Sequence, residues 1–112
     1  MQGEVRLYPE PLRSIAAGSI SGSYNTIGSP FDHPIYVIHL VNDTDKAMTF
    51  SWDGIDDHLY LPAGGFLVLD ITTNHAPNSS GLYFSVGQRI FVAEATVAPT
   101  TGIVTLAAFY AV

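Results

Sequence analysis

The sequence predicts an all-β protein, a single antiparallel β-sandwich or jelly roll of about eight to nine strands over residues 1–112. Ten Gly and seven Pro interrupt the chain at short intervals, and the segments between them are rich in the β-branched and aromatic residues that strands favour. No segment has the apolar repeat of an amphipathic helix longer than a turn. With 47% apolar residues, the chain is large enough for one domain with its own core.

About ten segments have the composition and length of strands. In chain order they are Glu4–Tyr8, Ser14–Ile20, Ser23–Ile27, Ile35–Val41, Ala47–Trp52, His58–Leu61, Phe66–Ile71, Leu82–Ser85, Ile90–Ala95 and Ile103–Ala111. Several of them are short, so we expect about eight or nine true strands.

The N-terminal part of the chain contains two different segments. In Met1–Pro11, Pro9 and Pro11 favour an extended backbone. This segment is therefore predicted to be either an extended arm across a neighbouring subunit or the first strand of its own sandwich. Ser14–Gly28 is rich in Ser, Gly and Ala but keeps apolar anchors, which favours thin strands that approach their neighbours closely over a flexible linker.

Residues 35–71 predict a meander of consecutive strands. Ile35–Val41 is apolar on both faces apart from His39, as expected for a strand that is covered on both sides. Asn42-Asp43-Thr44-Asp45 then supplies turn-forming residues before the alternating apolar and polar pattern of residues 47–52. This order predicts a hairpin between the two strands.

The second half of the chain continues the pattern of strands and turns. Asp53-Gly54 and Pro62-Ala63-Gly64-Gly65 are turn sequences, and the long Thr72–Gly81 segment is expected to loop across to the other sheet. Ile103–Val112 is almost wholly apolar. It is long enough for a strand and too short for a membrane-spanning helix, so it is predicted to be a buried closing strand.

The charge of the chain excludes some partners. Four Lys and Arg against ten Asp and Glu give a net charge of −6, which is the wrong sign for binding nucleic acid or an anionic membrane. Charged residues make up only 12% of the chain, so part of its surface is expected to be covered by other protein rather than by solvent alone. Met1–Pro11 also lacks the apolar stretch of a signal peptide, and secretion by that route is not expected.

No catalytic, cofactor-binding or metal-binding constellation is evident. The chain has no Cys, and its four His form no chelating pair. Gly18-Ser19-Ile20-Ser21-Gly22 has Ile where a hydrolase motif needs its nucleophilic Ser. The acidic segment Asp53–His58 lacks EF-hand spacing and is interpreted as a solvated turn in preference to a calcium site. The sequons that begin at Asn42 and Asn78 are interpreted as incidental.

A carbohydrate-binding module is the alternative function of a different class. Trp52, Tyr60 and Tyr83 would form its aromatic platform, and Asp56, Asp57 and His58 its polar edge. Because Trp52 alternates with Phe50 and Met48, a position in the core is favoured for this residue.

The chain resembles small structural proteins of the virions of tailed bacteriophages. The motifs that carry the resemblance are Glu4-Val5-Arg6-Leu7-Tyr8-Pro9-Glu10-Pro11, Gly18-Ser19-Ile20-Ser21-Gly22-Ser23-Tyr24, Val41-Asn42-Asp43-Thr44-Asp45, Ser51-Trp52-Asp53-Gly54-Ile55-Asp56-Asp57-His58, Leu61-Pro62-Ala63-Gly64-Gly65-Phe66 and Ala108-Phe109-Tyr110. The resemblance implies a non-enzymatic β-sandwich without cofactors, assembled in the bacterial host cytoplasm. It would bind other virion subunits, and we expect it to assemble with copies of itself at the neck or tail of the particle. A capsid decoration protein is the alternative of the same class.

Residues at the two ends of the chain are the candidate interface. They are Tyr8, Pro9, Pro11, Phe109 and Tyr110. Both faces of the terminal strand are largely apolar, whereas one sandwich core covers only one of them. We therefore expect its second face to meet either the N-terminal segment or another subunit, with Phe109 or Tyr110 as the outward anchor.

Overall fold

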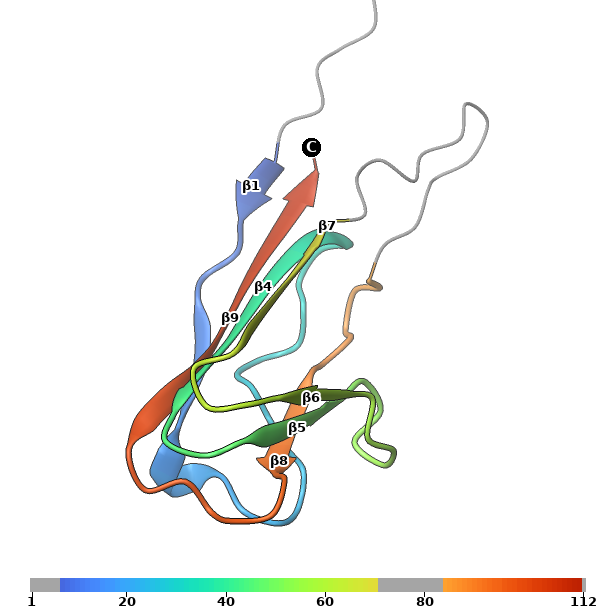
Figure 1. The fold of residues 1–112 in the computed structure, drawn as a ribbon. Helices are drawn as coiled ribbons and strands as arrows, with labels where there is room; N and C mark the ends of the chain where they lie inside the picture. Colours follow the sequence, from blue (N-terminus) through green and yellow to red (C-terminus); the bar gives the residue numbers. More distant parts are fainter. Residues whose placement is uncertain (1–6, 71–83, 112) are drawn as a thin grey trace, which may run out of the picture.

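The computed structural model describes residues 7–70 and 84–111, which form a β-sandwich of two antiparallel sheets (Figure 1). Sheet A contains β1 (Leu7–Pro9), β2 (Arg13–Ala16), β4 (Ile35–Thr44), β7 (Phe66–Asp70) and β9 (Gly102–Ala111). Sheet B contains β3 (Asn25–Thr26), β5 (Met48–Ser51), β6 (Leu59–Leu61) and β8 (Phe91–Glu94). A single 3₁₀ turn, η1 (Ala17–Ser19), follows β2. The predicted fold class is confirmed.

The ladder between β4 and β9 is the centre of sheet A. Each strand has ten residues, and they pair from Ile35 opposite Tyr110 to Thr44 opposite Gly102. Alternate residues point toward sheet B, so Leu40 and its partner Leu106 are both fully buried. They pack in one apolar cluster with Met48, Phe50, Leu61 and Val92 of sheet B. The closing strand predicted at the C-terminus is β9, and its inward face is buried.

The predicted meander is wrong in its first step. β4 and β5 do not form a hairpin, because β4 pairs with β7 and β9 in sheet A while β5 pairs with β6 and β8 in sheet B. The turn-forming residues Asn42 and Thr44 continue β4, with both side chains buried. The chain turns only at Asp45 and Lys46, and there it crosses between the sheets.

The other expected strands differ mainly in length. The hairpin of β5 and β6 is present, but β7 returns to sheet A instead of pairing with β6. The strand expected at Ser14–Ile20 ends at Ala16, and the one expected at Ser23–Ile27 is reduced to two residues. In the segment expected at Leu82–Ser85, Phe84 forms an isolated bridge with Ile35. The expected Thr72–Gly81 loop lies outside the described residues. The described strands before and after it, β7 and β8, belong to different sheets.

Gly102 is required at the start of β9. Its φ is +98°, and a Cβ built at this position would lie 2.0 Å from the backbone oxygen of Asp43. Gly102→Ala is therefore expected to lower the free energy of unfolding by about 2 kcal/mol. Denaturant titration followed by Trp52 fluorescence measures this loss. Gly18→Ala, where an added Cβ meets nothing within 4 Å, is the control and should change stability by less than about 0.5 kcal/mol. Equal effects of the two substitutions would contradict this account of Gly102.

Candidate interaction surface

Four of the five candidate interface residues meet at one end of sheet A. β1 pairs with the end of β9, so that Tyr8 lies opposite Tyr110 and Pro9 opposite Phe109. The rings of Tyr8 and Tyr110 stack with their centroids 5.8 Å apart. Pro11 lies outside this group, between β1 and β2, where it lines a shallow depression. Residues 7–9 are thus a strand of their own sandwich, and the first part of the proposed arm lies outside the described residues.

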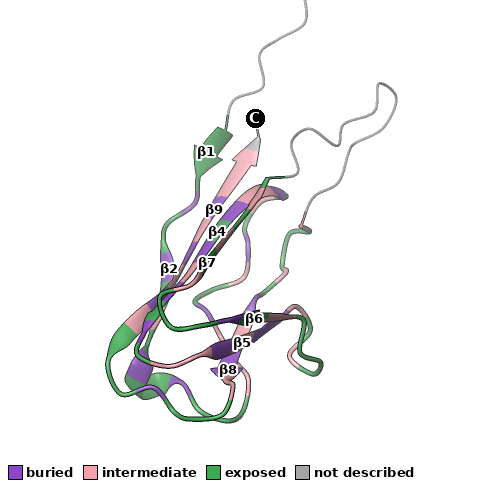
Figure 2. Ribbon diagram, viewed as in Figure 1, coloured by how far each residue is buried: buried purple, intermediate pink, exposed green. Residues whose placement is uncertain are grey.

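The face of sheet A that points away from sheet B is largely apolar. We call it the outer face, and its residues on β4, β7 and β9 are Val37, His39, Val41, Asp43, Phe66, Val68, Asp70, Ile103, Thr105, Ala107 and Phe109. Side chains from three strands form rows across it, such as Ala107, His39 and Val68. Phe66 is 64% exposed and Val68 55% exposed, and the remaining apolar side chains are partly buried. Figure 2 shows the burial classes along the strands of sheet A.

The charges near the outer face are few. Two carboxylates, Asp43 on β4 and Asp70 on β7, lie at its ends. The described residues of these strands on this face include no Lys or Arg. The ring of His39 packs edge-on against Phe66 with the centroids 6.1 Å apart. An exposed apolar face with charges only at its ends has the composition of a protein contact surface.

The described part of the N-terminal segment, from Leu7 on, meets β9 along its edge and not across its second face. β1 and β2 pair side by side with β9 in the plane of sheet A, because the strand offers a free edge of backbone donors and acceptors. Phe109 belongs to the outer face, whereas Tyr110 packs against the core. The ring of Tyr110 stacks on that of His33, with the two ring centroids 3.6 Å apart. Of the two proposed outward anchors, only Phe109 points outward. Contact of this face with another subunit stays a prediction.

A buried ion pair holds the N-terminal segment in place. The side chains of Glu10 and Arg13 are 1% and 4% exposed, and Arg13 donates to Glu10 Oε1 at 2.7 Å. Glu10 Oε2 lies 2.7 Å from Nδ1 of His33 and accepts the backbone N–H of Asp32 at 3.1 Å. Burial by itself raises the pKa of Glu10, but the hydrogen bonds from His33 and Arg13 outweigh it and hold the pKa below 4.5.

Arg13 also joins this segment to the loop before β4. Its guanidinium donates to the backbone oxygens of Ser29 at 2.7 Å and Pro30 at 2.9 Å, and it lies 5.1 Å from the centre of the Phe31 ring. Sequence reasoning missed this network, since Glu10 and Arg13 look like ordinary surface charges. The spacing of opposite charges three residues apart was the only local signal, and it does not indicate burial.

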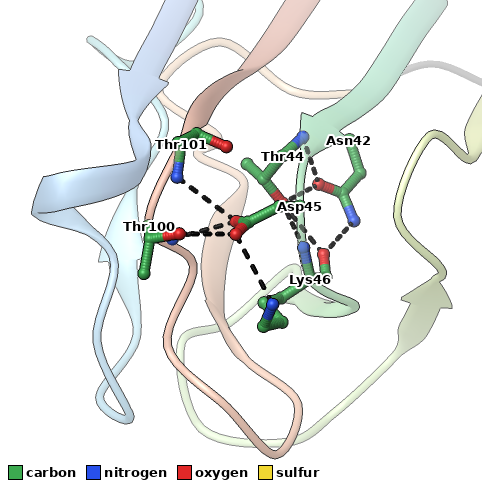
Figure 3. Close-up of polar contacts among 6 residues, drawn as sticks. All are labelled: Asn42, Thr44, Asp45, Lys46, Thr100 and Thr101. Atoms are coloured by element: carbon green, nitrogen blue, oxygen red, sulfur yellow. Dashed lines mark hydrogen bonds and ion pairs between the residues drawn. The ribbon is translucent and has the colours of Figure 1, made fainter.

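The buried Asn42 holds two crossovers between the sheets. Its Nδ2 donates to the backbone oxygens of Lys46, Leu61 and Pro62 at 3.0–3.1 Å. Its Oδ1 accepts the N–H and the hydroxyl of Thr44 at 3.2 and 2.6 Å (Figure 3). Asn42 therefore fixes the connection from β4 to β5 and that from β6 to β7. The side-chain amide of Asn42 is buried and hydrogen-bonded within the fold, which fits the interpretation of this sequon as incidental.

Asp45 holds a third connection between the sheets, close to the two that Asn42 holds. Its carboxylate accepts the hydroxyl of Thr100 at 2.5 Å and the N–H groups of Thr100 and Thr101 at 2.9 and 3.3 Å (Figure 3). These hydrogen bonds, above all the one from the Thr100 hydroxyl, hold the pKa of Asp45 far below its usual range. The connection from β8 to β9 is thereby fastened to the end of β4. Together, Asn42 and Asp45 place β7 and β9 on either side of β4.

The acidic turn at residues 53–58 is organised by its own hydrogen bonds. Oxygen or nitrogen atoms of Asp53, Asp56 and His58 lie within 4.8 Å of one another, and all three residues are exposed. Asp53 Oδ1 accepts the N–H groups of Asp56 and Ile55, which lower the pKa of Asp53 to about 2. His58 Nδ1 accepts the N–H of Trp52 at 2.9 Å. Asp53 Oδ1 and His58 Nδ1 thus accept hydrogen bonds that shape the turn.

Trp52 and Tyr60, the two described residues of the proposed aromatic platform, differ in burial. Trp52 packs against the core, with its ring 6.2 Å from that of Phe84. Tyr60 lies opposite Thr49 on β5, on the face of sheet B that points away from the core, and is 59% exposed. Tyr83 lies outside the described residues. The expected core position of Trp52 agrees with its partial burial.

Comparison of the chain with protein-family models, curated proteins and solved structures found no match in any of the three. Within the part of the chain that the structure describes, no helix is long and apolar enough to cross a membrane.

Proposed function

We propose that this chain is a non-enzymatic structural protein of a tailed-bacteriophage virion. It assembles in several copies and binds other virion subunits at the neck or tail of the particle, which is built in the bacterial host cytoplasm. The observation that carries the proposal is the outer face of sheet A, an apolar surface with exposed Phe66 and Val68 and with charges only at its ends.

Two further features support a structural role. The polar side chains that are buried, such as Glu10, Arg13 and Asn42, are engaged in fastening strands and crossovers, and each has its hydrogen-bond partners within the fold. The resemblance to virion proteins extends over motifs that form these same elements, including Asn42–Asp45. A rigid sandwich with an apolar face suits a subunit that repeats in an assembly.

Purified particles provide the test of this proposal. Tailed particles isolated from the culture that produces the chain are expected to contain it in several copies, as measured by quantitative mass spectrometry. In solution, size exclusion with light scattering is expected to give a mass larger than the 12.0 kDa monomer. A monomer at all concentrations that is absent from the particles would refute the proposal.

Labelling in electron microscopy locates the chain within the particle. Antibody density at a single vertex or along the tail is expected for a neck or tail subunit. Density spread over the head would instead identify a capsid decoration protein, because decoration proteins cover the capsid surface.

A further inference from the structure

One row of side chains crosses the face of sheet B that points away from the core. Thr49 on β5 lies opposite Tyr60 on β6 and opposite Ala93 on β8. Tyr24 directly precedes β3 and continues its register with β8, which places it beside Ala93. The row across all four strands of sheet B, about 14 Å long, is therefore Tyr24, Ala93, Thr49 and Tyr60. We call this row, together with the adjoining Asp57, the tyrosine face.

The side chain of Tyr24 lies across this face. Its hydroxyl donates to Asp57 Oδ1 and lies 3.4 Å from Oγ1 of Thr49, so the ring crosses β8 from the side of β3 to reach β5. Ala93 is only 3% exposed although it points away from the core, and the ring of Tyr24 above it accounts for this burial. The ring is held at its backbone and at its hydroxyl, so its position is already set before a ligand binds.

Tyr60 is the exposed aromatic side chain of this face. It is 59% exposed, and its side chain forms no hydrogen bond or ring contact with residues 7–70 and 84–111. Oδ2 of Asp57 likewise accepts no hydrogen bond within the described part of the chain. The tyrosine face therefore combines an accessible aromatic ring with an accessible carboxylate oxygen and the hydroxyl of Thr49.

We propose that the tyrosine face binds a neutral oligosaccharide. A pyranose ring has an apolar face of C–H groups, which packs on an aromatic ring, and hydroxyl groups around its edge, which donate to carboxylates and to other hydroxyls. Tyr60 stacks on one sugar ring, and Asp57 Oδ2 accepts hydrogen bonds from its hydroxyl groups. Because the row extends to Tyr24, it has room for a second sugar ring, which favours an oligosaccharide over a monosaccharide.

The charges near the tyrosine face select a neutral ligand. Asp53 and Asp56 belong to the same exposed turn as Asp57, and the chain has a net charge of −6. The phosphates of a nucleotide, which also stacks on aromatic rings, would be repelled by these carboxylates. The same repulsion acts on the carboxylates of an acidic sugar.

The proposed saccharide site does not rest on the proposed assembly. The tyrosine face belongs to sheet B and the outer face to sheet A, and the apolar core lies between the two sheets. The two faces therefore point away from each other. A chain that is assembled through sheet A still presents the tyrosine face to a saccharide.

Nuclear magnetic resonance of the isotope-labelled chain tests the site. The probes are maltohexaose, cellohexaose and chitohexaose, each added to about 10 mM. At least one of them is expected to shift the amide resonances of β5, β6 and residues 53–58, with saturation. Hexagalacturonate, an anionic probe of the same length, is expected to bind at least about 10-fold more weakly. No shift with any neutral probe, or tighter binding of hexagalacturonate, would overturn the proposal.

Substitution of Tyr60 tests the stacking contact. Tyr60→Ala is expected to weaken binding of the tightest neutral probe at least about 10-fold, whereas Tyr60→Phe keeps the ring and should stay within about 3-fold of the parent chain. The matched control is Phe66→Ala, which removes an aromatic side chain of similar exposure, 64%, from the outer face of sheet A. It should leave the saccharide affinity unchanged. Thermal melting of each variant verifies that it is folded.

Substitution of Asp57 tests the polar edge. Asp57→Asn is expected to weaken binding about 5-fold, because an ionised acceptor forms the stronger hydrogen bond with a hydroxyl group. Asp56→Asn, which removes the same charge from the neighbouring exposed side chain, should have no effect beyond about 2-fold. Equal losses for the two variants would show that only the overall charge of the turn matters, and would refute the contact with Asp57.

The remaining outcomes separate this proposal from the proposed function. If Tyr60→Ala and Phe66→Ala affect the saccharide affinity equally, the tyrosine face is not the site. If no probe binds but Tyr60→Ala abolishes binding of another particle protein, the face is a protein contact and the saccharide proposal is refuted. Light scattering of Tyr60→Ala should match that of the parent chain. A chain that binds the saccharide, stays monomeric and is absent from particles would refute the proposed function alone.

Discussion

Replacement of Asn42 by alanine is expected to lower the free energy of unfolding by about 4 kcal/mol. The side chain is fully buried and supplies the donors for three backbone oxygens and the acceptor for Thr44. Alanine removes the acceptor of the buried Thr44 N–H and one hydrogen bond from each of the three carbonyls, of which that of Lys46 keeps the Thr44 hydroxyl and that of Pro62 keeps the Gly65 N–H. A buried group that is left unsatisfied costs about 1–3 kcal/mol. Two crossovers lose their common anchor at the same time.

Denaturant titration followed by the fluorescence of Trp52, the only Trp of the chain, measures this loss. The control is Asp43→Ala on the same strand, where the side chain is exposed and the change should be within about 0.5 kcal/mol. If Asn42→Ala were no more destabilising than Asp43→Ala, the crossovers would have to be held by other contacts.

Replacement of Glu10 by glutamine is expected to lower stability by about 3 kcal/mol at neutral pH, because it leaves the buried Arg13 without its counter-charge. The guanidinium is 4% exposed and cannot regain its hydration without moving the segment that it anchors. Asp32→Asn is the matched control, since it removes the same charge from an exposed neighbouring side chain. It should change stability by less than about 0.5 kcal/mol.

The loss caused by Glu10→Gln should depend on pH. The pKa of Glu10 is lower in the folded chain than its ordinary value of 4.5. The ionised carboxylate therefore contributes its full share to the free energy of unfolding at pH values above 4.5. The contribution is lost as the pH falls below 4.5 and through the folded pKa. Urea titrations between pH 7 and pH 3 should therefore show the difference between the parent chain and Glu10→Gln shrinking with acidity. A difference that stayed constant, or grew, would show that the carboxylate is not held in its ionised form by the fold.

The local pattern of the sequence was sufficient to locate most strands. Alternating apolar residues identified β5 and β6, and the segments apolar on both faces identified β4 as a central strand and β9 as a closing strand. The same pattern also indicated the outer face. In a two-sheet fold the core covers only one face of each strand, so a strand that is apolar on both faces leaves one apolar face outside the core. The pairing of β1 with the end of β9, which brings Tyr8 and Pro9 beside Tyr110 and Phe109, was not predicted from the sequence.

The pairing of strands was decided by the tertiary structure. Asn42 and Thr44 have the local preferences of turn residues, yet they continue β4 because distant carbonyls and the buried corner satisfy their side chains. Glu10 and Arg13 are buried because a loop some twenty residues further along supplies His33 and the backbone oxygens that compensate their charges. Local propensity determined where this chain extends. Which edges meet depended on hydrogen bonds and burial between residues far apart in the sequence, and no local pattern encodes those contacts.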